Sequence, residues 1–180
     1  GKSLEFTVAF DEAVTLTGTG SVLQLDIGGT TREAVYSKKT ATSVTYVYTV
    51  QAGDQDADGI DIKDIQLHGS TLRDAAGNSA NLSLSGHRPA VSNLKIDGIA
   101  PTLDGLIGVP VNGVYGVGKV LTFSVPLSKS VTLDLSAGAP ALVLTVGSES
   151  RDAVYNGAAS TPTSLVFNYT VQAGDADANG

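Results

Sequence analysis

The feature that most constrains this chain is an internal repeat, in which the second half restarts the sequence of the first. Residues 1–8 (GKSLEFTV) match residues 118–125 (GKVLTFSV), and YTVQAGD occurs both at residues 48–54 and at residues 169–175. Between these runs, residues 32–36 (REAVY) match residues 151–155 (RDAVY) in the same order. A co-linear match of this length does not arise by chance, so the chain is predicted to contain two copies of one structural unit.

The two copies are incomplete at opposite ends. The first copy lacks a counterpart of residues 99–117, and the second copy stops where the first runs on into residues 60–84. A unit without some of its strands leaves open sheet edges and an exposed part of its core. We therefore expect a longer parent protein with a tandem array of such units.

Alternation of apolar and polar residues with a period of two runs through both copies. Leu4, Phe6, Val8 and Phe10 alternate with more polar residues, and clusters of Gly, Asn, Asp and Ser separate the apolar runs. Short strands with such turns predict an all-β fold, an immunoglobulin-like antiparallel β-sandwich in tandem repeats. A unit assembled from both copies has strands near residues 100–115, 118–127, 140–147, 150–156, 164–172, 60–67 and 79–84. The predicted domains are residues 1–97, a repeat lacking its first strand, and residues 98–180, a repeat lacking its last strands.

Composition excludes several classes of function. The 180 residues carry 11 Lys and Arg against 18 Asp and Glu, a formal charge of −7, which argues against nucleic acid as a partner. There is no Cys, so disulfides, zinc–thiolate sites and cysteine nucleophiles are ruled out, and no apolar run is long enough for membrane insertion. The only histidines, His68 and His87, lie outside the repeated segments, and no catalytic motif is present. We expect that the chain is not an enzyme.

One run of the sequence suggests a binding site for a cation. Residues 54–59 (DQDADG) place carboxylates at alternate positions before a glycine, and residues 175–180 (DADANG) repeat the pattern. Three acidic side chains on a tight loop converge on a point that no ammonium group fills, which suits a hard cation with oxygen ligands. The predicted cofactor is therefore Ca²⁺, with the backbone carbonyl of Ile60 and the linker residue Asp97 as further ligands. The complete set of predicted calcium ligands is Asp54, Asp56, Asp58, Ile60, Asp97, Asp175, Asp177 and Asn179.

The same run has a simpler interpretation, because Asp, Asn and Gly are good turn formers between strands.

Alternating strand directions place the acidic loop at the end of the sandwich that faces the linker, residues 93–101. A bound ion there would stiffen the junction with the next unit. Whether calcium bridges two units or sits within one stays open, because the second copy has Ser128 and Lys129 where the first has Asp11 and Glu12.

Four segments resemble the immunoglobulin-like, cadherin-like repeats of very large bacterial surface and secreted adhesins. They are residues 10–14 (FDEAV), the run YTVQAGD with its following DADG, residues 74–80 (DAAGNSA), and the boundary around residues 96–101 (IDGIAP). In that family such repeats are extracellular spacers, often stiffened by calcium, which carry an adhesive domain away from the cell. The resemblance implies an extracellular location at a bacterial surface, neighbouring repeats of the same chain as partners, and a cell-surface or matrix ligand bound through other domains.

A ligand-binding adhesion module, for carbohydrate or another surface, is the alternative function. Sugar sites commonly use exposed aromatic platforms, but the chain has no Trp, and most of its tyrosines fall on expected strands. Some lectins bind sugars through a calcium ion, so a cation site alone does not distinguish a spacer from a ligand-binding module.

Overall fold

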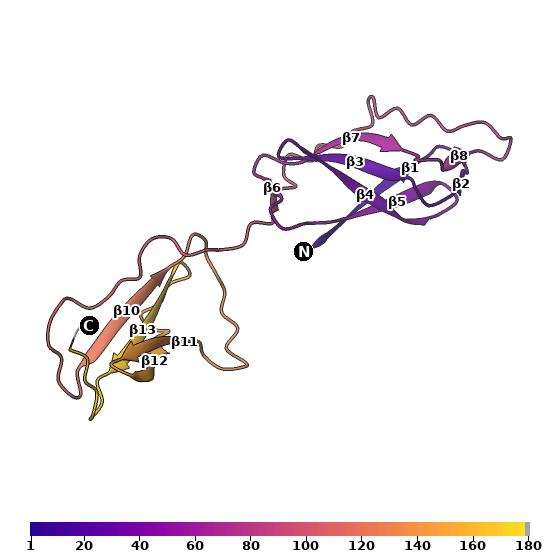
Figure 1. The fold of residues 1–180 in the computed structure, drawn as a ribbon. Coiled ribbons are helices and arrows are strands. Elements are labelled where there is room, and N and C mark those ends of the chain that lie inside the picture. Colours follow the sequence, from indigo (N-terminus) through magenta and orange to yellow (C-terminus); the bar gives the residue numbers. More distant parts are fainter. Residues whose placement is uncertain (179–180) are drawn as a thin grey trace. The chain divides into compact units, whose positions relative to one another are not determined.

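The computed structural model describes residues 1–178 and divides into two compact units, Gly1–Ala100 and Pro101–Gly180 (Figure 1). All regular elements of the described residues are strands, and the ladders that join them are antiparallel. The predicted all-β class is therefore confirmed. No helix in the described part of the chain is long and apolar enough to cross a membrane.

Unit 1 is built on one five-stranded sheet. Its order is β1 (Ser3–Ala9), β5 (Ser43–Thr49), β4 (Thr30–Lys39), β3 (Val22–Ile27) and β7 (Asp61–Gln66). Two short ladders complete the unit: β2 (Thr15–Thr17) pairs with β8 (Thr71–Arg73), and β6 (Gln55–Asp56) pairs with β9 (Ile96–Asp97). The strands β1 and β7 stand at opposite edges of the sheet, yet residues of both line one cavity, so the sheet is strongly curled.

The core of unit 1 lies inside this curl and follows the alternation of the strands. Leu23 and Leu25 on β3 and Val44 and Tyr46 on β5 are almost fully buried. The one polar atom at the end of the Tyr46 ring is satisfied, because its hydroxyl lies 2.8 Å from Ser21 Oγ. A buried Tyr with a bonded hydroxyl contributes a large apolar surface without an unpaired polar group.

Unit 2 contains a four-stranded sheet in the order β10 (Val120–Pro126), β13 (Ser164–Thr170), β12 (Glu149–Tyr155) and β11 (Ala141–Val146). This order repeats that of β1, β5, β4 and β3 in unit 1. Its core is smaller, with Ala153, Phe167 and Tyr169 buried, and Tyr155 packs edge-on against Phe167 at a centroid distance of 5.9 Å.

Two of the expected strands are not formed. Residues 79–84 are coil apart from one bridge between Ser79 and Arg73, and residues 100–115 carry only isolated bridges. The alternation in residues 82–84 (LSL) comes from packing rather than pairing, since Leu82 and Leu84 lie on the core as coil. The strand that pairs in this region is β8, which the sequence did not indicate.

Candidate functional site

The predicted cation-binding run forms the loop between β5 and β7, which we call the acidic loop (residues 51–59). The loop turns at Gly53, whose φ of 89° is costly for any other residue. The turn is closed by two hydrogen bonds: the Asp54 N–H donates to the Gln51 carbonyl (3.2 Å), and the Gln51 N–H donates to Asp54 Oδ2 (2.7 Å). The side chain of Asp54 is thereby directed into the unit rather than toward solvent.

Asp54 is only 3% exposed and meets two side chains from the sheet. Arg32 Nε on β4 donates to Asp54 Oδ1 at 2.9 Å, and the hydroxyl of Tyr48 on β5 donates to Asp54 Oδ2. We call these three residues the Arg–Tyr–Asp cluster. With the Gln51 N–H, both oxygens of the buried carboxylate are satisfied, as a buried charge requires.

The cluster holds Asp54 in its charged form. Burial by itself raises the pKa of the Asp54 carboxyl, but the hydrogen bonds from Tyr48, Gln51 and Arg32 outweigh this effect and leave the pKa below its ordinary value. Burial and the neighbouring carboxylate raise the pKa of Tyr48. The charged Asp54 carboxylate forms an ion pair with Arg32 and accepts a hydrogen bond from the neutral Tyr48. These two interactions attach the acidic loop to β4 and β5.

Asp56 fastens the acidic loop at a second point. Its Oδ2 accepts a hydrogen bond from the Gly28 N–H (2.7 Å), at the turn between β3 and β4, and its Oδ1 accepts one from the Gly59 N–H (2.8 Å). Gly28 has a φ of 56°, and a Cβ added there would lie 2.1 Å from the Gln55 carbonyl oxygen. Only glycine allows the hairpin turn to approach the loop this closely.

Unit 2 contains the same arrangement. Arg151 Nε donates to Asp175 Oδ1 (3.0 Å), the Tyr169 hydroxyl donates to Asp175 Oδ2, and the Gln172 N–H donates to the same oxygen (2.7 Å). The hydrogen bonds from Tyr169, Gln172 and Arg151 lower the pKa of Asp175. Asp177 Oδ2 accepts from the Gly147 N–H at 3.0 Å, as Asp56 does from Gly28.

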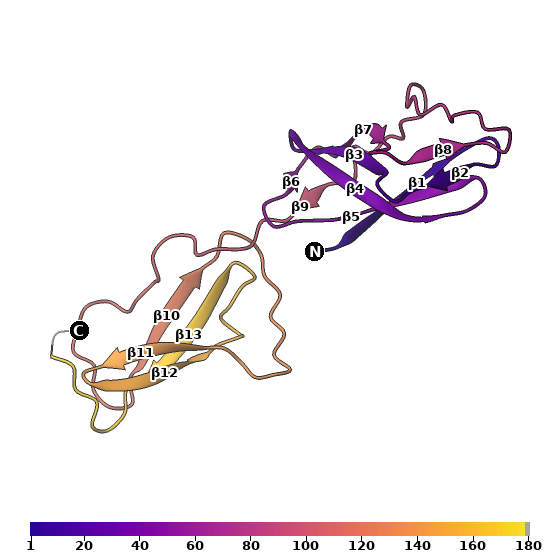
Figure 2. The ribbon, with the colours of Figure 1, turned by 45° about the vertical axis from the view of Figure 1, so that its right-hand side comes forward.

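The acidic loop of unit 1 also binds the segment by which the chain leaves that unit (Figure 2). The strands β6 and β9 pair Gln55 with Asp97 and Asp56 with Ile96. The ladder continues through Gly98, whose N–H donates to the Asp54 carbonyl (2.7 Å) and whose carbonyl accepts from the Gly53 N–H (3.1 Å). The predicted proximity of Asp97 to the acidic run is thus observed, through backbone pairing.

The predicted calcium ligands do not converge on one point. All four carboxylate oxygens of Asp54 and Asp56 accept hydrogen bonds from protein donors, and a guanidinium faces Asp54 where no ammonium group was expected. Asp58 and Asp97 are exposed, the side chain of Ile60 is buried in the core, and Asn179 lies outside the described residues. In residues 1–178 no three His, Cys, Asp or Glu side chains form a group that could hold a metal ion. The arrangement of Asp54 and Asp56 therefore does not fit a calcium site.

Sequence reasoning missed Arg32, Tyr48 and Gly28 as partners of the acidic residues. A usable signal was present, because each of them recurs in the second copy together with its aspartate. Residues that recur together are candidates for contact, even when 22 positions separate them as they do Arg32 and Asp54.

Comparison with known proteins adds no relative: no family model, no curated protein and no solved structure matches the chain.

Proposed function

We propose that this chain is a structural spacer of a large extracellular bacterial adhesin, made of immunoglobulin-like tandem repeats that project an adhesive domain from the cell surface. The observation that carries the proposal is the double occurrence of the Arg–Tyr–Asp cluster, at matching positions of both units. A binding or catalytic site keeps polar atoms accessible to its ligand. A set of hydrogen bonds that recurs in each unit, with its polar atoms satisfied internally, supports a structural role for the repeated module.

The position of the cluster suits such a role. Loops are the parts of a domain that open most readily, because they bury little apolar surface. In unit 1 the acidic loop is tied to β4 and β5 through Asp54, to the β3–β4 turn through Asp56, and to the outgoing segment through β9. These bonds hold the outgoing chain against the body of the unit as far as Gly98.

Single-molecule force spectroscopy on the whole chain tests the spacer role. We expect two unfolding events, one for each unit, and a lower unfolding force for the corresponding unit in Asp54→Asn and in Asp175→Asn. Asp61→Asn is the matched control, since the Asp61 side chain is 74% exposed. Unfolding forces unaffected by both cluster variants would contradict the proposal. Binding of the whole chain on a glycan array would favour the alternative, a carbohydrate-binding module.

Calcium binding stays a prediction of the sequence. Because Asp54 and Asp56 are committed to protein donors, Ca²⁺ would need ligands from exposed groups such as Asp58 and Asp97. At an affinity usual for extracellular modules, about 10⁻⁴ M, free calcium at about 1 mM would stabilise a site by about 1.4 kcal/mol. A melt in calcium and in excess chelator, together with Asp58→Asn, measures this contribution. An unchanged melt in chelator would remove calcium from the proposal and leave the cluster untouched.

A further inference from the structure

The strand β1 of unit 1 has one paired edge and one open edge. Its residues pair with β5 from Ser3 opposite Thr49 to Ala9 opposite Ser43. On its other side, no strand and no backbone hydrogen bond is found among residues 1–178. An open edge presents a row of backbone donors and acceptors that can pair with another strand.

In unit 2 the corresponding strand β10 has its outer edge covered. Residues 102–108 run antiparallel to it and form the bridges Leu103–Leu127 and Gly108–Ser124. Gly108 and Ser124 exchange two hydrogen bonds, of 2.7 and 2.9 Å. Two more are donated by the Asp104 N–H to the Pro126 carbonyl (3.0 Å) and by the Ser128 N–H to the Thr102 carbonyl (2.9 Å).

Because the sequence repeat aligns β1 with β10, the backbone groups at the open edge of β1 can be identified from their counterparts in β10. Thr7 pairs with Thr45 as Ser124 pairs with Val166, so β1 and β10 have the same register against their neighbours. The backbone bonds at the strand ends agree as well: Phe10 N–H donates to Thr42, and Leu127 N–H donates to Thr163. By this correspondence the groups at the open edge of β1 are the N–H and C=O of Thr7, the C=O of Ala9 and the N–H of Asp11.

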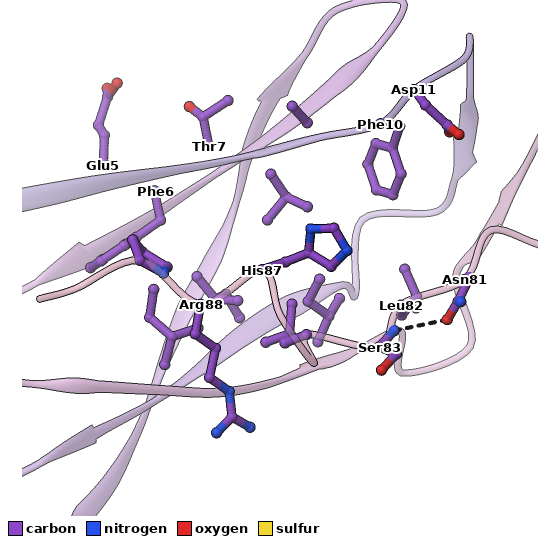
Figure 3. Close-up of a pocket in the computed structure, with 17 residues that line it drawn as sticks. Glu5, Phe6, Thr7, Phe10, Asp11, Asn81, Leu82, Ser83, His87 and Arg88 are labelled. Carbon is purple, nitrogen blue, oxygen red and sulfur yellow. Dashed lines mark hydrogen bonds between the residues drawn. The ribbon is translucent and has the colours of Figure 1, made fainter.

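A groove of about 720 Å³ lies next to this edge (Figure 3). Its lining includes residues 5–11 of β1 and its extension, the buried Ile62 and Ile65 of β7, and residues 81–84 and 87–89 of the segment that follows β8. Figure 3 shows Phe6 and Phe10 on the side of β1 that faces His87 and Arg88, with Glu5 and Thr7 on the opposite side. Arg88 Nη2 donates to the Lys63 carbonyl at 2.9 Å, which ties the far wall of the groove to β7.

We propose that this groove binds an extended polypeptide strand by addition to the edge of β1, and that the strand it fits has the sequence of residues 102–108. The added strand forms the backbone bonds that residues 102–108 form with β10, and it covers apolar side chains of the groove. In unit 2 the residue opposite Ser124 is a glycine, and a Cβ added at Gly108 would lie 2.2 Å from Ser124 Oγ. The hydroxyl of Thr7, at the position that matches Ser124, lies 3.1 Å from Thr45 Oγ1 on the paired strand β5.

Hydrogen exchange of the whole chain, measured amide by amide with NMR, tests the proposal. The probe is a synthetic peptide of residues 99–111 (IAPTLDGLIGVPV). We expect a slowing of exchange by tenfold or more at the amides of Thr7 and Asp11, with no change at Ser124 and Ser128. The matched control is the same peptide with Gly108→Pro, which lacks the N–H that pairs at this position.

Three results would overturn the proposal: no slowing at Thr7 and Asp11, equal slowing with the proline peptide, or slowing at β7 in place of β1. Sedimentation equilibrium of the chain without peptide identifies the natural donor. A dimer that the peptide dissociates, with the same two amides protected, makes a second copy of this chain the donor. A chain that stays monomeric and binds the peptide at β1 takes the strand from another source.

Discussion

Asp54 receives hydrogen bonds from three parts of unit 1: Arg32 on β4, Tyr48 on β5 and the backbone of Gln51. Substitution by Asn keeps the size of the side chain, but it removes the charge and turns one acceptor into a donor that faces donors. We expect Asp54→Asn to lower the free energy of unfolding of unit 1 by about 2–3 kcal/mol. Chemical denaturation measures this, and Asp61→Asn should stay within about 0.5 kcal/mol of the wild type.

The lowered pKa values of Asp54, Asp56 and Asp175 fix the sign of a pH dependence. A carboxyl whose pKa is lower in the folded state stabilises the fold when it is charged, so its contribution is complete above the unfolded value, about 4. As the pH falls below about 4, the unfolded chain takes up protons first and the contribution is lost.

We therefore expect the free energy of unfolding to fall steeply from about pH 4 to about pH 2. The fall should be shallower in Asp54→Asn, because one of the responsible carboxylates is gone. Denaturant titrations at a series of pH values test both statements. An equal slope in the variant and the wild type would show that Asp54 does not titrate with the lowered pKa described above.

At the scale of elements, the turn between β3 and β4 is positioned by its contact with the acidic loop. Gly28 and Gly29 follow each other in this turn and both have positive φ, 56° and 81°. A Cβ at Gly28 would lie 2.1 Å from the Gln55 carbonyl oxygen, whereas a Cβ at Gly29 would meet no atom within 4 Å. A substitution at Gly29 therefore measures the cost of the left-handed backbone alone, whereas a substitution at Gly28 adds the cost of steric overlap.

We expect Gly29→Ala to cost about 1 kcal/mol, the penalty of a left-handed backbone for alanine. Gly28→Ala should cost about 1–3 kcal/mol more, because the turn and the loop must move apart. Thermal denaturation of the two variants measures the difference. Equal losses would mean that the loop yields freely and is not held by the turn.

The strands that the sequence predicts well are those whose alternation reflects one buried face. β10, β11 and β13 fall within their expected ranges, since apolar residues at every second position commit one side to the core. Residues 79–84 show why a strand predicted from alternation alone can be wrong. Leu82 and Leu84 alternate, but pairing requires a free strand edge in reach, and a local pattern carries no information about that.

The candidate site, like the fold, was predicted from the sequence only in part. The sequence identified Asp54 and Asp56 as special and placed Asp97 near them, but it did not indicate the protein groups that donate hydrogen bonds to their carboxylates. The partners that satisfy their oxygens come from β4, from β5 and from the β3–β4 turn. Spacing within a loop describes only that loop, whereas the repeated Arg32 and Tyr48 held the information about distant contacts.

At the scale of the whole molecule, the two units differ in the size of their cores. Fourteen buried side chains form the core cluster of unit 1, and three form that of unit 2, counted over the described residues. Burial of apolar surface is the main favourable term in folding, so we expect unit 1 to be the more stable. We expect two transitions in calorimetry, with unit 2 melting first.

The separate fragments 1–100 and 101–180 assign the transitions. Fragment 1–100 should reproduce the upper one, and fragment 101–180 should melt at or below the lower one. Asp175→Asn should shift only the transition of unit 2, which provides an internal check. A single transition shared by both units, or a higher melting temperature for fragment 101–180, would contradict the expectation.

Each Arg–Tyr–Asp cluster takes every donor and acceptor from its own unit. A gene that encodes such units can gain or lose one by in-frame recombination, and the remaining clusters keep all their bonds. The length of the protein is then free to vary among descendants without compensating substitutions.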